Sequence, residues 1–504
     1  MKFFYSPARS YVSFILFILV FLLQCSAPND MQESLLGLTI LPANATSSPS
    51  HPQTQWSRLI EMSGTTDSSG KIYSKKNRFL SEVANDVTSD SQGNIYATGV
   101  IEASAWDAYV GVSFIARYDG AGNKLWSKLF GNYVSDSVIG RLMIEDDIGI
   151  YVADTPNHVI SKKITADIHG NIYIAGEIKD SLNGENKYAF IAKYDSLGNR
   201  LWERYLNDNA RPTWVESITS DPQGNVYAIG PYANTYEHVY TFIAKYDGDG
   251  NIQWTKHAID PQIQKTSVIF GKEITSDSQG NLYITGETEV ISSEGKKVSN
   301  LFLTKYDKNG NTLYTKFLGN VGPGVYIDGF YNLPDTSGHG ITCDSQGYIY
   351  IVGETNGNGL DNLAQIKNDP SAFIIKYDGN GNVLWTRLID GSDDPYTIAS
   401  DSQGNVYMTG NLYTYKNSTF DGQTVTYGDA FVIKYDATGR KLWTKLLDAE
   451  MSLYRSELHD SGTTRPTGLA IDLIGNIYVV GHSTDEALAG PYNSFIVKYD
   501  QNQF

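Results

Sequence analysis

The feature that most constrains the fold of this chain is a short motif that occurs seven times. The motif reads D-x-x-G-N-x-Y, with Tyr for Asn in one copy, and its copies begin at Asp90, Asp167, Asp221, Asp277, Asp344, Asp401 and Asp472. A second motif, F-[ILV]-x-[KR]-Y-D, follows each copy, beginning at Phe114, Phe190, Phe242, Phe302, Phe373, Phe431 and Phe495. A third element, an aromatic residue in a short apolar run, comes next in only six copies, at Trp126, Trp202, Trp254, Tyr314, Trp385 and Trp443. Such periodicity indicates one supersecondary unit repeated along the chain.

Each repeat predicts four antiparallel strands. A short run such as Ile274 to Ser276 precedes the D-x-x-G-N turn, N-I-Y-A-T-G follows it, and the other two motifs supply strands three and four. Asp and Asn side chains cap such turns, and Gly accepts the positive φ that they need. Seven units of this kind predict an all-β fold, a seven-bladed β-propeller of four-stranded antiparallel blades. We expect the repeats to begin near residues 84, 162, 215, 271, 338, 396 and 467.

The missing seventh copy of strand four is predicted at the other end of the repeats. The segment T-Q-W-S-R-L-I, from Thr54 to Ile60, closely matches K-L-W-S-K-L-F from Lys124 to Phe130. The last repeat ends in F-I-V-K-Y-D at Asp500, without a strand four. We therefore expect Thr54 to Ile60 to complete the last blade, because closing the ring removes exposed strand edges. Basic residues of strand four, such as Lys128 and Arg387, are expected to protect its outer edge.

The repeats resemble a known family. Copies of D-[SP]-Q-G-N-[IVL]-Y-x-x-G, followed by F-I-x-K-Y-D-x-x-G-N-x-x-W, are similar to the bacterial SBBP β-propeller repeat and cover residues 54–504. The resemblance implies a seven-bladed propeller. It implies no particular reaction or ligand, because a fold alone does not assign a function.

The N-terminal region predicts export. Lys2 and Arg9 precede an apolar run from Tyr11 to Leu23 that is too short to span a bilayer, which is typical of a signal peptide. L-L-Q-C, ending at Cys25, resembles a bacterial lipobox in which the Cys becomes lipidated, although Gln24 departs from the usual small residue. An ordinary secretory signal or an uncleaved anchor remain alternatives. We expect a signal peptide over residues 1–24, a flexible tether over 25–53, and a lipid anchor in the cell envelope, at the outer membrane, with the leaflet and face left open.

Net charge and cysteine content limit the classes of partner and the disulfides that are expected for this chain. The formal charge is −17, and removing residues 1–24 with their two cations takes it to −19, which disfavours nucleic acid or an anionic lipid surface as a partner. With Cys25 lipidated, Cys343 has no partner for a disulfide. We expect a monomer with no cofactor and no metal site.

Function is expected on one face of the propeller. The turns within strand pairs one–two and three–four are uniformly short, whereas the other connections vary up to the insertion from Gly131 to Lys163, and all the variable connections leave from one face. Candidate ligand-binding side chains follow the strand-two glycine at the expected tunnel mouth; they are Glu177, Glu287, Glu354, His482 and Asn411. They could hold a cation or a sugar, or simply be solvated. Aromatic residues in the variable loops could stack on carbohydrate or grip a protein, or pack their own loops; they are Tyr232, Tyr236, Tyr331, Tyr396, Tyr413, Tyr415 and Tyr492.

The opposite face carries the seven repeat aspartates, for which turn capping is favoured over metal binding. D-G-D-G-N at Asp247 lacks the Gly and Glu of an EF-hand and is expected to be a hairpin turn. No H-E-x-x-H or G-x-S-x-G motif is present. Two hypotheses remain: a non-catalytic scaffold that binds a protein or glycan, and an exported hydrolase or lyase that uses His482 with Glu177 or Glu354.

Overall fold

The structure is a computed structural model, and the residues it describes divide into strands and turns. The chain separates into two units, residues 1–48 and 49–504. The described residues all lie in the second unit and are 54–60, 80–105, 108–130, 157–180, 187–206, 214–235, 238–258, 268–291, 297–318, 325–327, 330–332, 336–355, 371–389, 394–412, 418–420, 423–425, 429–447, 464–483 and 493–500. Among them, none forms a helix long and apolar enough to cross a bilayer.

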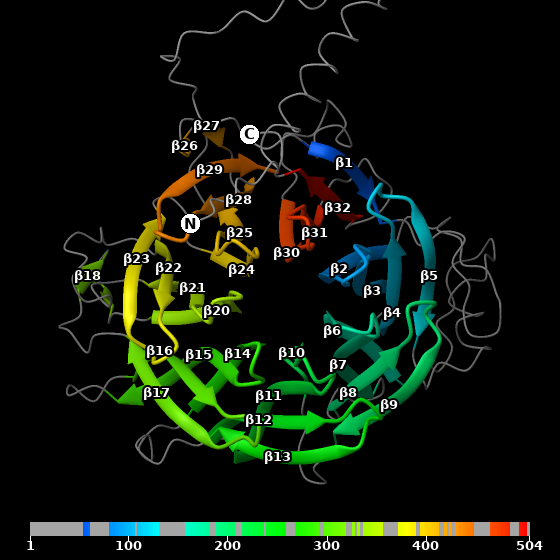
Figure 1. The fold of residues 1–504 in the computed structure, drawn as a ribbon, viewed down its shortest axis with the longest axis horizontal. Coiled ribbons are helices and arrows are strands. Elements are labelled where there is room, and N and C mark those ends of the chain that lie inside the picture. The colour runs from blue at the N-terminus through cyan, green and yellow to red at the C-terminus, as the bar shows by residue number, and fades with distance from the viewer. Residues whose placement is uncertain are drawn as a thin grey trace, which may run out of the picture. The chain divides into compact units, whose positions relative to one another are not determined.

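Seven four-stranded antiparallel blades make up this region, as the repeats predict (Figure 1). Blade one contains β2 (Leu80–Ser89), β3 (Ile95–Ala105), β4 (Ala108–Tyr118) and β5 (Lys124–Phe130). Blade two contains β6 (Asn157–Ala166), β7 (Ile172–Asp180), β8 (Lys187–Tyr194) and β9 (Arg200–Leu206). Blade three contains β10 (Ser217–Ser220), β11 (Val226–Thr235), β12 (His238–Tyr246) and β13 (Ile252–Ala258). Blade four contains β14 (Val268–Ser276), β15 (Leu282–Ile291), β16 (Lys297–Tyr306) and β17 (Thr312–Leu318).

The remaining blades follow the same order, with the first strand of each nearest the centre. Blade five contains β20 (Thr336–Cys343), β21 (Ile349–Thr355), β22 (Ser371–Tyr377) and β23 (Val383–Ile389). Blade six contains β24 (Asp394–Ser400), β25 (Val406–Leu412), β28 (Asp429–Tyr435) and β29 (Lys441–Leu446). Two small hairpins occupy variable connections, formed by β18 (Val325–Ile327) with β19 (Phe330–Asn332) and by β26 (Ser418–Phe420) with β27 (Gln423–Val425).

The last blade contains both ends of the repeat region, which confirms the predicted closure. Its strands are β30 (Thr464–Ile471), β31 (Ile477–Ser483) and β32 (Asn493–Tyr499), and its fourth is β1 (Thr54–Leu59). Strands β1 and β32 are antiparallel, with Trp56 opposite Lys498 and Leu59 opposite Phe495. The strand that stands alone at the front of the sequence therefore belongs to the last blade.

The core consists of seven apolar layers, one between each pair of neighbouring blades. The layer between blades seven and one includes Trp56 and Ile60 of the closing strand beside Phe114. The tyrosine of each D-x-x-G-N-x-Y motif is fully buried between blades; these residues are Tyr96, Tyr173, Tyr227, Tyr283, Tyr350, Tyr407 and Tyr478. Strand two is apolar on both faces because a neighbouring blade covers each side.

The basic residues of strand four have a role that the sequence did not predict. The Nζ of Lys128 donates a hydrogen bond to the Gly198 carbonyl at 2.7 Å, and the Nε of Arg387 donates to the Gly439 carbonyl at 2.7 Å. Each acceptor lies in the three–four turn of the next blade. These cations therefore join neighbouring blades as well as lining the outer edge.

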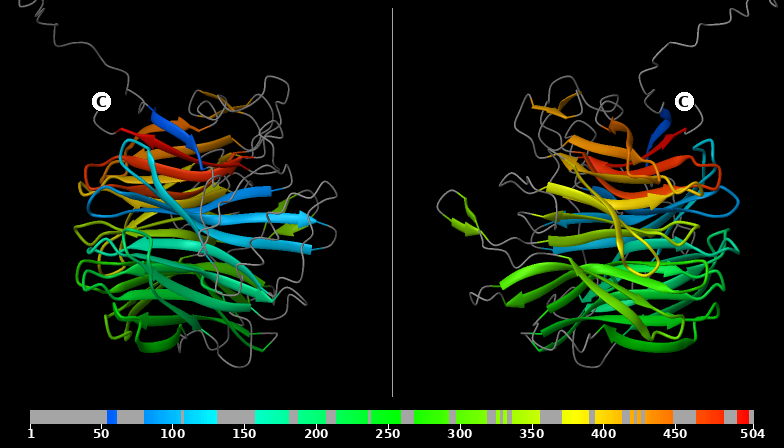
Figure 2. Two further views of the ribbon diagram at one scale, coloured as in Figure 1. Left: turned by 90° about the vertical axis from the view of Figure 1, so that its right-hand side faces the viewer. Right: turned by 60° about the vertical axis from the view of Figure 1, so that its left-hand side comes forward.

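The two faces of the propeller differ, as Figure 2 shows. Thirteen described turns within strand pairs have the same length, and each contains one glycine with a φ between 74° and 90°. The connections of variable length leave from the opposite face, which we call the loop face; the other is the turn face. The predicted end of the long insertion is wrong. Because β6 begins at Asn157, the connection before it covers residues 131–156 and not 131–163. The segment 157–163 extends the inner strand because the pairing of β6 with β7 continues past a bulge.

Candidate binding site at the tunnel mouth

A β-bulge in each inner strand shapes the loop-face end of the tunnel. In blade four the register shifts between Gly271 and Glu273, so Lys272 is the extra residue. The strand-two glycine opposite allows this approach, because a Cβ on Gly286 would lie 2.0 Å from the Phe270 carbonyl oxygen. Blade three has the same arrangement, with Glu216 and Ser217 both opposite Ile229. The bulged residues are Asn85, Lys162, Glu216, Lys272, His339, Tyr396 and Thr467.

The five predicted site residues occupy one level of the ring, directly after these glycines. Each pairs with the inner strand of its own blade: Ile160 with Glu177, Phe270 with Glu287, Ser337 with Glu354, Asp394 with Asn411, and Arg465 with His482. Glu177 and Asn411 are buried, and the other three are half-buried. They belong to five different blades, and the nearest partners of Glu287 and Glu354 are the bulged residues Lys272 and His339.

Glu177 and Glu287 face lysines. The Oε1 of Glu177 lies 3.2 Å from the Nζ of Lys179 and 4.0 Å from that of Lys162. The Oε2 of Glu287 accepts a hydrogen bond from Lys272 at 3.2 Å and another from the Ser337 hydroxyl at 2.9 Å. Since Ser337 belongs to blade five, this contact joins two blades. Paired carboxylates of this kind are poorly suited to bind a free cation.

Glu354 has a histidine partner, but that partner is His339. The Oε1 of Glu354 lies 3.3 Å from the Nε2 of His339, whose Nδ1 lies 2.9 Å from the Pro395 carbonyl oxygen of blade six. Burial of Glu354 opposes its ionisation, but the hydrogen bond and charge of His339 outweigh it and lower the pKa of Glu354.

His482 lies beside an arginine. Burial first, and the charge of Arg465 second, lower the pKa of His482 to about 4. The Arg465 side chain in turn donates to the Tyr396 hydroxyl at 2.8 Å and lies 3.8 Å from Asp394, both of blade six. In the same pair of blades, the Asn411 amide donates to the Thr464 carbonyl at 2.7 Å. A histidine with so low a pKa is uncharged at neutral pH, which makes it a weak proton donor there.

Sequence reasoning missed a second charged level, deeper in the tunnel. The Nζ of Lys163 in blade two donates to the Oε2 of Glu273 in blade four at 2.8 Å. The Ser217 hydroxyl of blade three, which lies between them, also donates to Glu273. Asp86 of blade one accepts a hydrogen bond from the Ile164 amide at 3.0 Å. Burial raises the pKa of Asp86 to about 6, although the charge of Lys163 opposes this shift.

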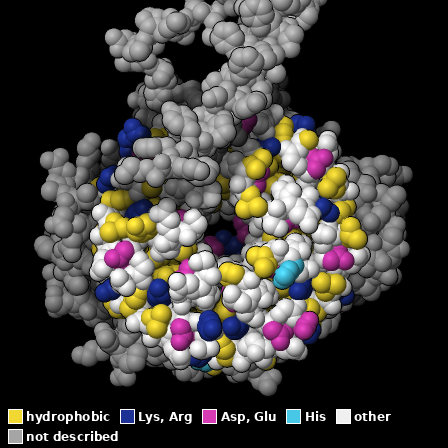
Figure 3. Space-filling model, in the orientation of Figure 1, with side chains coloured by type: hydrophobic (Ala, Val, Ile, Leu, Met, Phe, Trp, Pro, Cys, Tyr) yellow, Lys and Arg dark blue, Asp and Glu magenta, His cyan; other side chains and the backbone are white. Residues whose placement is uncertain are grey.

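A signal for this level exists in the sequence. All three charged residues stand four positions before a repeat aspartate, where the seven copies have Asp86, Lys163, Ser217, Glu273, Gly340, Thr397 and Gly468. An alignment of the repeats shows acidic or basic residues at this position in three copies and small residues, Ser, Thr or Gly, in the other four. Figure 3 shows acidic and basic side chains inside the central opening.

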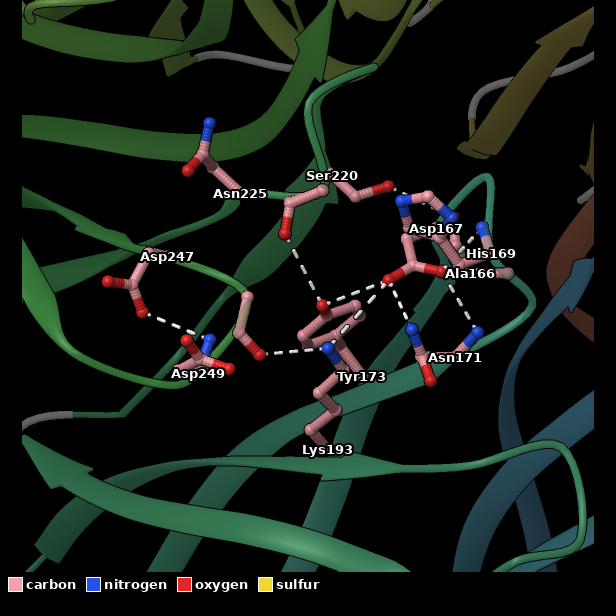
Figure 4. Close-up of polar contacts among 12 residues, drawn as sticks. Ala166, Asp167, His169, Asn171, Tyr173, Lys193, Ser220, Asn225, Asp247 and Asp249 are labelled. Carbon is pink, nitrogen blue, oxygen red and sulfur yellow. Dashed lines mark hydrogen bonds and ion pairs between the residues drawn. The ribbon is translucent and has the colours of Figure 1, made fainter.

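The repeat aspartates are turn caps. Asp167 accepts hydrogen bonds from the amides of His169 and Asn171 at Oδ1, and from the Asn171 side chain and the Tyr173 hydroxyl at Oδ2 (Figure 4). Lys193 lies 4.0 Å from the same carboxylate and donates to the Gly248 carbonyl of the next blade at 2.8 Å. Asp247 of D-G-D-G-N caps its own turn in the same way. Among the described residues, no three His, Cys, Asp or Glu side chains are grouped to hold a metal ion.

Other predicted residues divide between described and undescribed parts of the chain. Tyr232 stacks on His257 with ring centroids 4.4 Å apart, and Arg465 lies over the Tyr396 ring. Cys343 is half-buried, and burial raises the pKa of its thiol to about 12, so it is not an activated nucleophile. Tyr331 lies in β19. Cys25, Tyr236, Tyr413, Tyr415 and Tyr492 lie outside the described residues.

Parts of the chain are similar to known proteins. The SBBP family model, described as a β-propeller repeat, matches residues 125–182 and 322–361. An uncharacterized WD repeat-containing protein of Acanthamoeba polyphaga mimivirus is 24% identical over 58% of this chain and 26% of its own length, so the chain spans about a quarter of that relative.

Solved structures with a similar outline have low sequence identity. The polysaccharide lyase Uly1 is 9% identical with a TM-score of 0.47, over 89% of this chain and all of its own (100%). A protein of unknown function from Dyadobacter fermentans DSM 18053 is 10% identical with a TM-score of 0.42, over 88% of this chain and 99% of its own. The chain thus folds as a seven-bladed β-propeller, and two segments of it match the SBBP β-propeller repeat model.

Proposed function

We propose that this chain is an exported β-propeller, anchored in the cell envelope through lipid on Cys25, that acts as a non-catalytic binding scaffold. Its ligand is a protein or a glycan, bound at the loop face and the tunnel mouth. The proposal depends mainly on the difference between the connections on the two faces. Thirteen turns of one length form the turn face, and the variable connections leave from the other.

The chemistry of the mouth supports a neutral, hydrogen-bonding ligand. The carboxylates of Glu177, Glu287 and Glu354 already lie beside Lys179, Lys272 and His339 respectively. Their charges are therefore compensated, which disfavours a free cation and suits sugar hydroxyls or backbone amides. Aromatic rings at the same end, Trp214, Tyr232 and Tyr396, offer apolar surface of the kind that both ligand classes use.

The alternative, a hydrolase or lyase, requires a proton-transferring pair at the mouth. His482, with a pKa of about 4, is a poor donor at neutral pH. The pair that lies closest to this requirement is His339 with Glu354, whose atoms are 3.3 Å apart. Because His339 also contacts the Pro395 carbonyl of the next blade, its geometry is that of a bridge between blades. These contacts favour the scaffold over the enzyme.

The proposal is tested by binding of the full acylated chain to a glycan array and to blotted envelope proteins. Two loop-face variants are compared, one with residues 131–156 shortened and one carrying Glu287→Gln and Glu354→Gln. The matched control carries Gln279→Ala and Gln346→Ala on the turn face. We expect at least one loop-face variant to bind about tenfold more weakly, a change of about 1.4 kcal/mol, and the control to bind normally.

Loss of binding in the turn-face control alone would contradict the proposal, as would failure of the full chain to bind any glycan or protein on either surface. If the chain cleaves a bound glycan and the Glu354→Gln variant does not, the result would favour the hydrolase or lyase instead.

A further inference from the structure

The chain enters the propeller from the turn face. Thr54, the first residue of β1, lies opposite Tyr499, and Tyr499 directly precedes Asp500 at the turn-face end of β32. The Gln55 amide donates to the Asp500 carboxylate at 2.8 Å, which fixes this end of the strand. Figure 2 shows β1 beginning on the side of the short turns. The peptide bond to residue 53 therefore leaves from the turn face of blade seven.

Exposed apolar side chains mark the turn face of the same part of the ring. Leu473 and Ile474, at the tip of the first turn of blade seven, are 72% and 74% exposed. In blade two, Ile168 and Leu197 are 58% and 65% exposed at the tips of its two turns. Blade one lies between these blades, since its inner strand β2 contacts both β30 and β6. We call these four side chains the apolar arc.

The apolar arc departs from the repeat. Three other copies of the same turn read D-S-Q-G-N and a fourth reads D-S-Q-G-Y, with Ser and Gln at the tips, which are exposed at Ser402 and Gln403 of blade six. Blade seven has Leu and Ile at these two tips, and blade two has Ile and His. Folding of the turn does not require the apolar residues, because Asp401 and Asp472 cap their turns with the same hydrogen bonds.

Charge is also distributed unevenly over the turn tips. The tips of the described turns in blades five, six, seven, one and two contain no Asp, Glu, Lys or Arg, whereas Asp249 and Lys308 stand at tips of blades three and four. Within this uncharged part of the ring, the apolar side chains are what distinguish blades seven and two. The cap aspartates behind the tips are occupied by hydrogen bonds within the turns. An uncharged surface with protruding apolar side chains fits the boundary between lipid headgroups and acyl chains.

We infer that the apolar arc docks on the lipid bilayer to which Cys25 is anchored, so that the turn face lies against the membrane and the loop face points away. This inference rests on the lipid anchor of the proposed function and adds the orientation of the scaffold. Residues 26–53 can span at most about 95 Å, so the anchor alone fixes no orientation. Docking of the arc supplies the second attachment that does.

The test reconstitutes the full acylated chain in phosphatidylethanolamine–phosphatidylcholine vesicles, which carry no net charge, with some of the lipids spin-labelled near the headgroup. In a Cys343→Ser background, a fluorophore is attached to Leu473→Cys, to Ser402→Cys at the equivalent turn tip of blade six, or to Thr235→Cys at the loop-face end of β11. We expect quenching at residue 473 to exceed that at residue 402 by about threefold or more, and residue 235 to be unquenched.

A second variant removes the arc from blade seven. Leu473→Ser with Ile474→Gln restores the polar tips of the other repeats, and a probe at Leu197→Cys should then lose most of its quenching, while ligand binding at the loop face stays unchanged. Equal quenching at residues 473 and 402, or stronger quenching at residue 235, would overturn the docking without affecting the scaffold. Failure of the chain to associate with vesicles would overturn the anchor and the docking together. Dimers in detergent that disappear in the polar-tip variant would overturn the docking in favour of a second copy on the arc.

Discussion

Lys163 of blade two reaches past blade three to Glu273 of blade four, with its Nζ 2.8 Å from the Oε2 of the carboxylate. The Ser217 hydroxyl of the intervening blade donates to the same carboxylate. Three blades are thus joined inside the tunnel by groups that stand at one position of the repeat. The two side chains are only 21% and 16% exposed, so neither charge is fully solvated.

Removing one partner of this pair should destabilise the propeller. Lys163→Met leaves Glu273 near Asp86 without its cation, and we expect a loss of about 2–3 kcal/mol in the free energy of unfolding. The double variant Lys163→Met, Glu273→Met should recover most of the loss, because neither charge then remains unpaired. Urea denaturation of the four chains measures the coupling. The more exposed Arg440–Asp436 pair is the control, for which Arg440→Met should cost less than about 1 kcal/mol. Equal losses in the two pairs would contradict a special role for the tunnel.

His482 should make the fold less stable in acid. Its pKa is about 4 in the folded chain against 6.5 ordinarily, so the folded state resists protonation. Stability is therefore fully present above pH 6.5 and is lost as the pH falls towards 4, by about 3 kcal/mol. His482→Gln should flatten the profile in this range, whereas His169→Gln in an exposed turn should not. An NMR titration of the imidazole near 6.5 instead of 4 would refute the prediction.

Asp86 should have the opposite effect. Its pKa is raised from 3.8 to about 6, mainly by burial, so its contribution to stability is present below pH 3.8 and is lost as the pH rises through 6. We expect Asp86→Asn to gain about 3 kcal/mol over the wild type between pH 4 and pH 8. Asp119→Asn is the comparison, and it should lower the free energy of unfolding at neutral pH, because hydrogen bonding to Asn123 lowers the pKa of Asp119. Parallel stability profiles of Asp86→Asn and the wild type would show that the carboxyl is not perturbed.

The strand-two glycine should be indispensable to the bulge. A Cβ at Gly286 would lie 2.0 Å from the Phe270 carbonyl oxygen, and backbone cannot move aside as a flexible side chain can. Gly286→Ala should therefore cost about 3 kcal/mol or more, at the upper end of overpacking effects. Gly120→Ala is the matched control, since a Cβ there meets nothing within 4 Å. Thermal melts of the two variants that agree within error would contradict this account of the bulge.

The architecture could be predicted from the sequence because its determinants are local. Each described turn is specified by an Asp and a Gly within five residues, with Asn as the fifth residue in all but two. The apolar runs around Tyr96 or Phe114 need only a neighbouring repeat to become buried. The closing strand was predictable for the same reason, since Trp56 stands in a recognisable copy of strand four.

The details of the site depend on distant residues. The sequence predicts the position after the strand-two glycine but not its partners. Two of these, Lys272 and His339, come from bulges whose location depends on the approach of two backbones. Glu354, which the sequence analysis pairs with His482, lies instead beside His339. The Lys163–Glu273 pair joins residues 110 positions apart, and only a comparison of equivalent repeat positions could have indicated it.

The account depends most directly on the closing strand, since both the ring and the entry of the chain at the turn face follow from it. The decisive measurement is hydrogen exchange of β32 in the full chain and in a chain lacking residues 54–60. We predict that amides of β32 bonded to β1 lose their protection in the shortened chain, while the equivalent strand β28 keeps its protection. Deleting residues 26–53 should leave both strands protected. Unchanged protection of β32 without residues 54–60 would contradict the closure of the propeller by its N-terminal strand.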